Sequence, residues 1–574
     1  MEMCCGYILL FLLGLAGYAY HKYVKRCARR EHLEKMIARR QREREESIEM
    51  AKRVSSKIDS VLRDRIASWN FEQLRDELQR GTITAVQAVQ TYFHQGVIAQ
   101  EKTNCATLFM KEAERWAEEW DEKAKDPSFK KPAFFGIPIS VKECVPVKGY
   151  DVTRGFAQDL FKPCENDSIL ITHVKKLGCI PFVETNVPQS LLTYNSCNPI
   201  YGATNHVLDK TRTTGGSSGG ESAILSAEGS ILGIGGDVGG SIRIPCHFTG
   251  MAGIKPSHLR FAHRGVTGAV PGRPLINAND GPMCRDVKTN VEFLRQVWGD
   301  SFQSDQDPYC PPVKFNESLY EEGRKYKIGY YVDDGWFTPV PAVQRAVLEA
   351  KEILEKAGHT VVPFRPPNVA QMFKMYIRAL CVDGGQFVLN KLLTDIMEPT
   401  LYTQAMIYAI PIWIQRLIAI PIRFVFPRLA NVMEAMTLST LELREAYAEI
   451  ESYRDAFVGQ MMNDGVDAIL CPPQVMVAPP HASPCKLFSA VTYTCIFNLL
   501  DFGAGVVNVT KVKPEDEDKL ENEYPQTDAW YKEAKRACKD TVGFPVNVQV
   551  AAAPYREEIV LRILRDIEIS VTGK

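Results

Sequence analysis

Short apolar runs typical of buried strands alternate with helical patterns along most of this chain. We predict strands at residues 135–141, 179–183, 327–331, 468–471, 505–509 and 546–551, and helices between them, for example at 343–357 and 557–569. This alternation is typical of a domain in which helices cover a central sheet. No internal repeat or low-complexity linker divides the pattern. We therefore expect a fold of class α/β, a single large domain with a central mixed sheet wrapped by helices.

An uncharged apolar run at residues 3–20 departs from this pattern. Its 18 residues reach the lower edge of membrane-spanning length. Positive charge just past such a run marks the cytosolic side, whereas a cleaved signal peptide carries its charge before the run. The basic residues that follow are Lys22, Lys25, Arg26, Arg29 and Arg30. We predict a single-pass N-terminal transmembrane helix with its basic flank in residues 1–30 and a cytosolic body. A signal sequence is the alternative.

The next stretch, residues 29–53, is dense in Arg, Glu and Lys. This composition predicts a solvated helix near the bilayer, which we take as a charged helical linker over residues 31–70. Its excess basic charge suits anionic lipid headgroups. A solvated spacer without a binding role is an equally good interpretation. The rest of the chain, residues 71–574, is the predicted main domain.

A second apolar region lies at residues 405–433, inside a segment of about 400–436 that we predict to be a membrane-binding cap. Three prolines together with Gln415, Arg416 and Arg423 interrupt it, and such breakers and charges are costly inside hydrocarbon. Aromatic side chains beside arginines instead suit a helical pair in the headgroup region. The residues expected to make this contact are Ile412, Trp413, Arg416, Arg423 and Phe424. An internal hairpin packed on the core is the alternative.

Overall composition narrows the possible partners. The formal net charge of −1 gives no general attraction to nucleic acid, so we expect no nucleic-acid partner. The 16 cysteines include no Cys-x-x-Cys pair, so neither metal-ligand spacing nor a small disulfide framework is present. We interpret these cysteines as buried free thiols in a reducing compartment, and we expect no metal and no cofactor.

Residues 214–256 carry the strongest chemical signal, because two Gly/Ser clusters at 215–220 and 235–241 flank a short helical stretch. Glycine at this density is costly unless the backbone must approach another group closely or adopt positive φ. Neither the phosphate-binding nor the dinucleotide-binding glycine pattern is present. Residues 215–219 match the Gly-x-Ser-x-Gly of a nucleophile elbow, but a polar run precedes them and no recognisable catalytic histidine follows. The remaining interpretation is a serine whose base is not histidine.

Lys142 is the candidate for that base. It ends the apolar run FGIPISVK, where a lysine can be partly buried. Burial disfavours the ammonium form, so a neutral amine could accept a proton there. Lysine–serine pairs are a known variation on nucleophile and base. From the residues alone, a lysine that reaches solvent from the end of a strand remains open.

Several motifs in order resemble the amidase signature family. They are GIPISVKE, GGSSGGESA, GDVGGSIRIPCHFTGMAGIKP, GPMCRDV and GFPVNVQV, and the resemblance extends from about residue 70 to 570. The N-terminal run, TNVPQS at 185–190 and LLDFGAGVV at 499–507 resemble the members of this family that act on fatty acid amides. These motifs together imply an amidase-type domain.

The resemblance implies a role for each matching residue. Ser241 would attack the amide carbonyl, and Lys142 would be the final base. Ser217 would relay the proton between them, and its peptide bond would be a non-proline cis bond. The N–H groups of the oxyanion hole would come from Val238, Gly239, Gly240 and Ser241. Losing one such donor typically costs about 100–1,000-fold in rate.

These expectations define one predicted activity. We predict a membrane-associated serine amidase that hydrolyses fatty acid amides, N-acylethanolamines and primary fatty amides, to free fatty acid and amine through an acyl-enzyme. Leu191, Leu192, Val238 and the cap would line an acyl channel. The partners would be fatty acid amide lipids, the bilayer of the endoplasmic reticulum or Golgi, and a second copy in a homodimer. The alternatives are an amidase for a soluble amide, an amidotransferase subunit, and a non-catalytic membrane scaffold.

Overall fold

The computed structural model describes residues 2–272 and 275–573, and for residues 2–12, 14–16 and 19 it describes the backbone alone. Within this part of the chain, eleven strands form one mixed sheet in the order β1-β3-β2-β6-β8-β7-β12-β13-β11-β9-β10. The strands are β1 Ala106–Phe109, β2 Pro138–Lys142, β3 Ile180–Thr185, β6 Leu232–Asp237, β7 Ala252–Lys255, β8 Asn279–Cys284, β9 Lys327–Tyr330, β10 Thr360–Pro363, β11 Ala468–Cys471, β12 Gly503–Lys511 and β13 Pro545–Ala552. A separate two-stranded ribbon contains β4 Cys197–Asn198 and β5 Gly202–Ala203.

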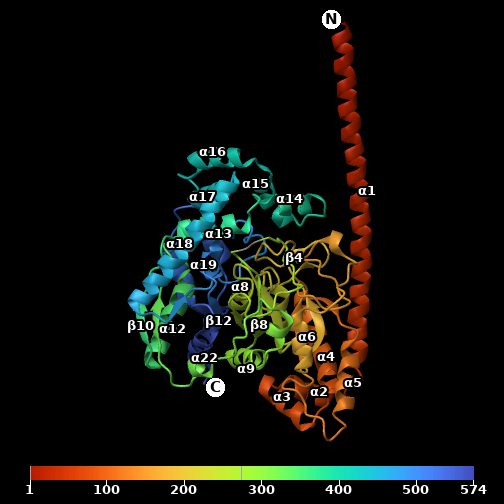
Figure 1. The fold of residues 1–574 in the computed structure, drawn as a ribbon, viewed down its shortest axis with the longest axis vertical. Coiled ribbons are helices and arrows are strands. Elements are labelled where there is room, and N and C mark those ends of the chain that lie inside the picture. Colours follow the sequence, from red (N-terminus) through yellow and green to blue (C-terminus); the bar gives the residue numbers. More distant parts are fainter. Residues whose placement is uncertain (1, 273–274, 574) are drawn as a thin grey trace.

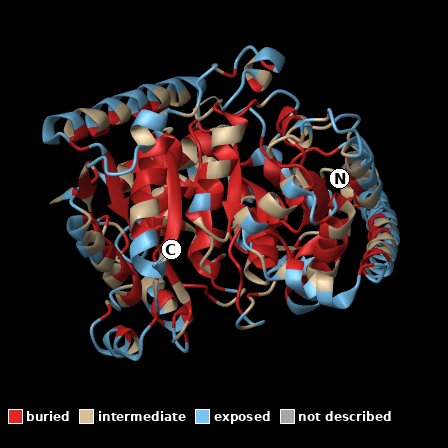
Figure 2. Ribbon diagram, turned by 90° about the horizontal axis from the view of Figure 1, so that it is seen from below, coloured by how far each residue is buried: buried red, intermediate tan, exposed pale blue. Residues whose placement is uncertain are grey.

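The sheet combines parallel and antiparallel neighbours. β2 runs parallel to β3 and β6, and β9 runs parallel to β10 and β11. The other pairs are antiparallel, including β6 with β8. Most strand residues are buried, while the outer faces of the surrounding helices are exposed, as Figure 2 shows. The predicted class, an α/β domain with a large mixed sheet wrapped by helices, is therefore confirmed.

Four helices precede the first strand, and the other helices of the described chain lie between or after the strands (Figure 1). They are α1 Glu2–Ser55, α2 Ser60–Ala67, α3 Phe71–Arg80, α4 Ala85–Thr103, α5 Ala113–Lys123, α6 Ile169–Lys176, α7 Gly219–Ser226, α8 Arg243–Thr249, α9 Val287–Val297, α10 Phe302–Gln306, α11 Glu317–Tyr320, α12 Pro341–Lys356, α13 Val369–Leu380, α14 Gln386–Leu393, α15 Tyr402–Ala409, α16 Ile412–Ile422, α17 Pro427–Ala435, α18 Thr440–Asp464, α19 Thr492–Leu499, α20 Pro514–Asn522, α21 Ala529–Ala537 and α22 Glu557–Thr572.

The apolar pattern located six of the eleven strands that the described part of the chain contributes to the sheet, and it missed β1, β6, β7, β8 and β10. The six predicted strands correspond to β2, β3, β9, β11, β12 and β13, and the two example helices correspond to α12 and α22. β6 (LGIGGD) and β8 (NDGPMC) contain Gly, Asp and Pro, which are depleted in strands. Both are nevertheless fully buried, because neighbouring strands pair with them on either side.

The charged segment after residue 30 is more than a solvated linker. α1 continues without a break to Ser55, and its second half packs along α4 and β1. The Arg40 guanidinium is buried and donates to Asp151 Oδ2 at 2.7 Å, and Arg44 donates to the Ala106 carbonyl oxygen. The sequence hid this contact because the buried face of the helix is itself partly charged.

The helices expected to form a cap lie on the side of the body toward which the N-terminal half of α1 extends (Figure 1). Among the described residues no single helix is long and apolar enough to cross a membrane. One bent pair, Pro399–Ala409 with Ile412–Ile422, meets the length and composition of a span, with its two halves at 102°. The expected membrane-spanning run at residues 3–20 falls mostly on side chains outside the described ones.

Candidate active site

Lys142 is the last residue of β2, which lies inside the sheet between β3 and β6. Its side chain is buried, and Nζ donates to Ser217 Oγ at 2.8 Å and to the Gly236 carbonyl oxygen at 2.9 Å. An amine in the protein interior needs such partners because burying it unpaired is costly. The lysine therefore does not reach solvent from the end of its strand, and it contacts the serine that was expected to relay its proton.

Ser217 lies in the glycine-rich loop before α7, and the Gly216–Ser217 peptide bond is cis, as the family resemblance implied. The glycines that follow are required by close packing. A Cβ on Gly219 would lie 2.2 Å from Ser196 Oγ, and a Cβ on Gly220 would lie 2.3 Å from the Asn186 nitrogen. The loop is thus pressed against two neighbouring segments, a close approach that only glycine allows.

Ser241 lies beside this loop. The Ser218 N–H donates to the Ser241 carbonyl oxygen at 3.0 Å, so the two Gly/Ser clusters are adjacent in space. In the described part of the chain, no hydrogen bond joins the hydroxyls of Ser217 and Ser241. Catalytic hydrogen bonds are often long before substrate binds. The structure thus contains the Lys142–Ser217 contact and places the Ser241 segment next to it.

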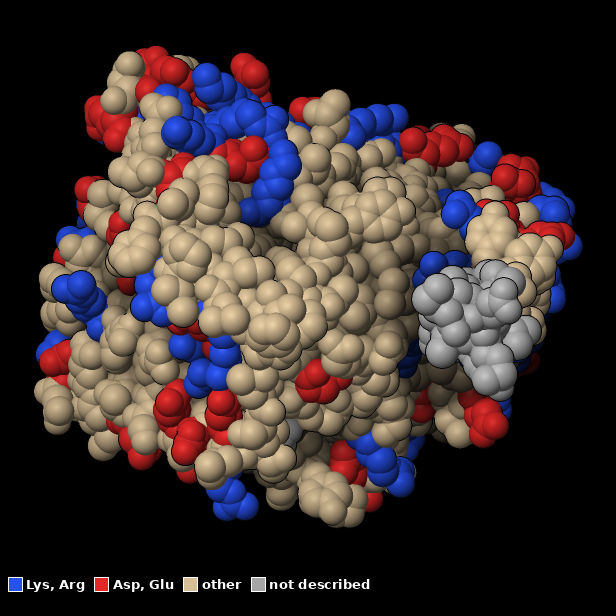
Figure 3. All heavy atoms as spheres, turned by 90° about the horizontal axis from the view of Figure 1, so that it is seen from above, with Lys and Arg blue, Asp and Glu red and all other residues tan. Residues whose placement is uncertain are grey.

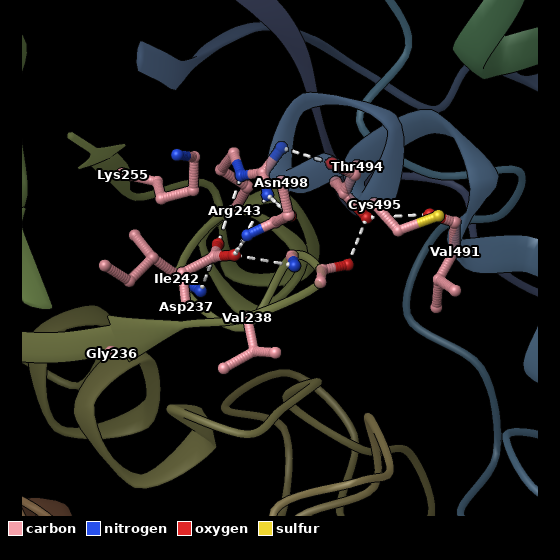
Figure 4. A network of polar contacts seen from close by, with 12 residues as sticks. Gly236, Asp237, Val238, Ile242, Arg243, Lys255, Val491, Thr494, Cys495 and Asn498 are labelled. Carbon is pink, nitrogen blue, oxygen red and sulfur yellow. Dashed lines mark hydrogen bonds and ion pairs between the residues drawn. The ribbon is translucent and has the colours of Figure 1, made fainter. Parts of the chain in front are cut away.

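Asp237 and Arg243 fix the loop that carries Ser241 (Figure 4). Both side chains are fully buried, and Arg243 Nη2 lies 2.9 Å from Asp237 Oδ1. Asp237 also accepts hydrogen bonds from the N–H groups of Gly240 and Ile242, and Arg243 Nη2 donates to Asn498 Oδ1. These bonds hold the pKa of the Asp237 carboxyl well below its usual range despite the opposing effect of burial. The loop therefore begins at one partner of this ion pair and ends at the other, and the pair holds the loop backbone in place.

The backbone of this loop exposes three N–H groups. The carbonyl oxygens of Val238 and Gly239 accept hydrogen bonds from Tyr376 and Thr494, respectively. No hydrogen bond from the N–H of Val238, Gly239 or Ser241 is found among the described residues. Gly240 differs from expectation, because its N–H donates to Asp237 Oδ1 at 2.8 Å instead of facing the cavity. Three of the four expected oxyanion donors therefore remain available.

A large cavity opens in front of Ser241 and encloses about 1130 Å³, part of it open to solvent. Ser241, Val238 and Gly239 lie at its wall, together with both leucines expected to contact substrate. Most of the remaining lining is apolar and comes from α13, α15, α17 and loops near the site. Members of this lining are Leu191, Leu192, Phe373, Ile377, Ile407, Val432 and Met436. An occupant of this cavity would be mainly apolar.

Two of the expected cap residues are strongly exposed. Trp413 and Phe424 expose 58% and 87% of their surface, and Leu417 and Ile420 beside them are also exposed. Figure 3 views the molecule from the side of α16 and shows a broad area without charged side chains, bordered by basic and acidic groups. Ile412 is half-buried. The cap thus presents an apolar surface.

The two arginines expected to contact lipid, Arg416 and Arg423, pair with carboxylates of this chain. Arg416 donates to both carboxylate oxygens of Glu442 in α18, at 2.9 and 2.6 Å, and this contact lowers the pKa of Glu442 to about 2. Arg423 is exposed and pairs with Glu434. Arg416 therefore ties α16 to α18, and its contact with lipid stays a prediction.

Sequence reasoning missed the buried charges that support the site. Glu221 in α7 accepts hydrogen bonds from Ser140 at 2.6 Å and Thr185 at 2.7 Å. Burial raises the pKa of its carboxyl to about 8. The sequence did contain a signal for these buried groups, because GGES and GDVGG each place one acidic residue among glycines and small side chains. Such a charge is seldom buried unless it is paired or neutral.

Comparison with known proteins agrees with the fold and the motifs. The family model described as Amidase matches residues 87–561. Fatty acid amide hydrolase 1 of Caenorhabditis elegans is 58% identical over 99% of this chain and 100% of its own length. Fatty-acid amide hydrolase 1 of Sus scrofa is 37% identical over 86% of this chain and 84% of its own. A solved structure titled Fatty acid amide hydrolase superposes with a TM-score of 0.77 at 22% identity, over 94% of this chain and 95% of that one.

The chain therefore belongs to the amidase family. It is a hydrolase that acts on the carbon–nitrogen bond of amides.

Proposed function

We propose that this protein is a membrane-associated serine amidase that hydrolyses fatty acid amides to a free fatty acid and an amine. Ser241 is the nucleophile, Ser217 the proton relay and Lys142 the base. The observation that carries the proposal is the cavity in front of Ser241, whose walls are largely apolar and reach the cap helices α15 and α17. A long acyl chain fits such a lining, whereas a small soluble amide would leave it unfilled. The names of the two fatty acid amide hydrolase relatives support the same substrate class.

The proposed reaction uses the three side chains in turn. Neutral Lys142 takes the proton of Ser217 while Ser217 takes that of Ser241, whose oxygen attacks the amide carbonyl carbon. The N–H groups of Val238, Gly239 and Ser241 stabilise the negative oxygen. The proton then returns through Ser217 to the leaving nitrogen, and the amine departs from an acyl-enzyme. Water repeats the sequence and releases the fatty acid.

The membrane arrangement is part of the same proposal. Residues 1–30 form a single-pass anchor in the endoplasmic reticulum or Golgi, and the segment around 400–436 of the amidase domain lies in the headgroup region. Residues 31–70 connect the two and dock on the body. Support comes from the exposed Trp413 and Phe424 and from the direction in which α1 extends (Figure 1). The body faces the cytosol, and two copies form a homodimer.

The experiment compares Ser241→Ala with a matched serine variant. We expect Ser241→Ala to lose labelling by a fluorophosphonate and to lower kcat on an oleoyl amide by at least about 1,000-fold. Ser226→Ala, a half-buried serine at the end of α7, should behave as wild type. The value of kcat/KM should rise with acyl length. Persistent labelling of Ser241→Ala would refute the nucleophile, and a preference for acetamide would favour a soluble amide as substrate.

A further inference from the structure

The peptide group between Val238 and Gly239 is held at its carbonyl oxygen by a tyrosine side chain. The Tyr376 hydroxyl donates to the Val238 carbonyl oxygen at 3.3 Å, and Tyr376 lies in the wall of the same cavity as Ser241. This peptide bond is trans. Because a trans peptide is planar and its C=O and N–H point in opposite directions, a bond that holds the Val238 oxygen also sets the direction of the Gly239 N–H.

The next peptide group of the loop is held at both of its ends. Thr494 donates to the Gly239 carbonyl oxygen at 2.7 Å, and the Gly240 N–H donates to Asp237 Oδ1 at 2.8 Å. The N–H of this peptide group is therefore occupied and is not available to an oxyanion.

The N–H of Ser241 is oriented by the backbone itself. The carbonyl oxygen of its peptide group, on Gly240, accepts the Ile244 N–H at 2.7 Å in the first turn of α8. For the Val238 oxygen, in contrast, the described part of the chain provides no backbone donor, and the hydrogen bond found is the one from Tyr376. Of the two available donors, one thus depends on a side chain that is distant in sequence.

Gly239 allows this anchor and also makes it necessary. A Cβ on Gly239 would lie 2.3 Å from the hydroxyl oxygen of Tyr376, so a residue with a side chain would displace the hydroxyl. Glycine also lets the preceding peptide group rotate, because it adopts backbone conformations that other residues rarely reach. The loop therefore needs a bond from another element to keep this N–H in one orientation.

Tyr376 is held firmly enough to supply that bond. It is buried, and its ring stacks on Phe373 with the ring centroids 6.5 Å apart and the planes at 11°. Its helix, α13, is fixed to α17, since Arg378 Nε donates to the Ala435 carbonyl oxygen at 3.1 Å. A hydroxyl fixed in this way costs no rearrangement when the reaction occurs.

We propose that Tyr376 is a positioning residue for the oxyanion hole, an inference that rests on the proposed function. Its hydroxyl holds the Val238 carbonyl oxygen, so that the Gly239 N–H points toward the oxygen that becomes negative when Ser241 attacks. Tyr376 acts through Gly239 and takes no part in the proton transfers. Its effect appears only as charge develops on that oxygen, so it lowers the reaction barrier more than it strengthens substrate binding.

The test uses the full chain with Tyr376→Phe, which removes the hydroxyl and keeps the ring that stacks on Phe373. We measure kcat and KM on an oleoyl amide. We expect kcat to fall by about tenfold or more, since losing a whole oxyanion donor typically costs about 100–1,000-fold and this donor loses only its orientation. KM should stay within about threefold of wild type, because the lost interaction belongs to the transition state.

An inhibitor separates the oxyanion hole from the rest of the cavity. Ser241 adds to the carbonyl carbon of an oleyl trifluoromethyl ketone, its proton passes to Ser217, and the ketone oxygen becomes the negative oxygen of a hemiketal. The inhibition constant of this ketone should rise in Tyr376→Phe by the same factor as kcat/KM falls. Binding of oleyl alcohol, which has the same chain and no carbonyl group, should stay within about twofold of wild type.

Tyr453→Phe is the matched control. Tyr453 is a buried tyrosine of α18 that lies outside the cavity lining, and its hydroxyl donates to the Pro367 carbonyl oxygen at 2.7 Å. This variant should have the kcat and the inhibition constant of wild type.

Three results would overturn the proposal. Tyr376→Phe could keep the wild-type kcat, it could bind the alcohol and the ketone equally more weakly, or it could lose kcat with no change in the inhibition constant of the ketone. A wild-type chain that fails to hydrolyse the oleoyl amide overturns the proposed function instead, so the two failures are distinguishable.

Discussion

At the scale of single residues, Glu221 beside the site is a buried carboxyl that has no cationic hydrogen-bond partner among the described residues. Glu221 is fully buried, and its hydrogen bonds come from two hydroxyl groups. Burial raises the pKa of Glu221 from 4.5 to about 8, so the folded protein binds a proton at this position more tightly than the unfolded chain. The stabilising contribution is therefore complete below about pH 4.5 and is lost as the pH rises through about 8.

Glu221→Gln should remove this dependence. Glutamine keeps the size of the side chain and is neutral at every pH. We expect the free energy of unfolding of wild type to fall by a few kcal/mol at most between about pH 5 and pH 8, and the variant to show a flatter profile there. Chemical denaturation at a series of pH values measures both. Glu118→Gln, at an exposed position of α5, is the control. Equal slopes in wild type and Glu221→Gln would contradict the argument.

Individual residues also mark what the sequence could and could not predict. Lys142 stood out because a lysine ended an apolar strand, and Ser217 and Ser241 stood out as serines among glycines. The family resemblance supplied their roles. Asn498 could not be found in this way, because it lies 255 residues from Arg243 and only folding brings the two together. The sequence also did not reveal that the Gly240 N–H, expected in the oxyanion hole, donates its hydrogen bond to the nearby carboxylate of Asp237.

At the scale of elements, α1 is the part whose role changed most. A solvated linker would tolerate loss of any single charge. The second half of α1 instead contributes Ala51 and Val54 to the main core and Leu33 and Ile37 to a smaller cluster. Composition predicted the helix, but the charges along it concealed the face that packs on the body.

Arg40→Ala tests this docking. The substitution leaves Asp151 buried without its ionic partner, and breaking a buried pair in this way typically costs about 3–5 kcal/mol. We expect the denaturation midpoint to fall clearly in this variant. Arg30→Ala, which removes a guanidinium with 71% of its side chain exposed, should leave the midpoint almost unchanged. Equal midpoints for the two variants would mean that α1 does not stabilise the body.

At the scale of the whole molecule, the two proposed membrane contacts belong to one folded body. α1 docks on the body beside β1, and the cap helices α15 and α17 line the cavity that contains Ser241. A lipid that enters from the bilayer would then reach the nucleophile without crossing water. The apolar face seen in Figure 3 and the apolar cavity beneath it are two parts of the same arrangement.

The anchor at residues 1–30 and the cap around residues 400–436 should strengthen each other's binding. Once one of them binds the bilayer, the effective concentration of the other at the bilayer rises. We expect vesicle sedimentation to be strongest for the full chain, weaker after deletion of residues 1–30 and weaker again when Trp413→Glu and Phe424→Glu are added to that deletion. Hydrolysis of a short soluble amide should stay at the wild-type rate in all three proteins, since Trp413 and Phe424 are exposed and do not line the cavity at Ser241. Val61→Glu, a change of similar exposure in α2 at the opposite end of the body, should not alter sedimentation. If the cap substitutions leave vesicle binding of the shortened chain unchanged, the exposed apolar surface is not a membrane contact.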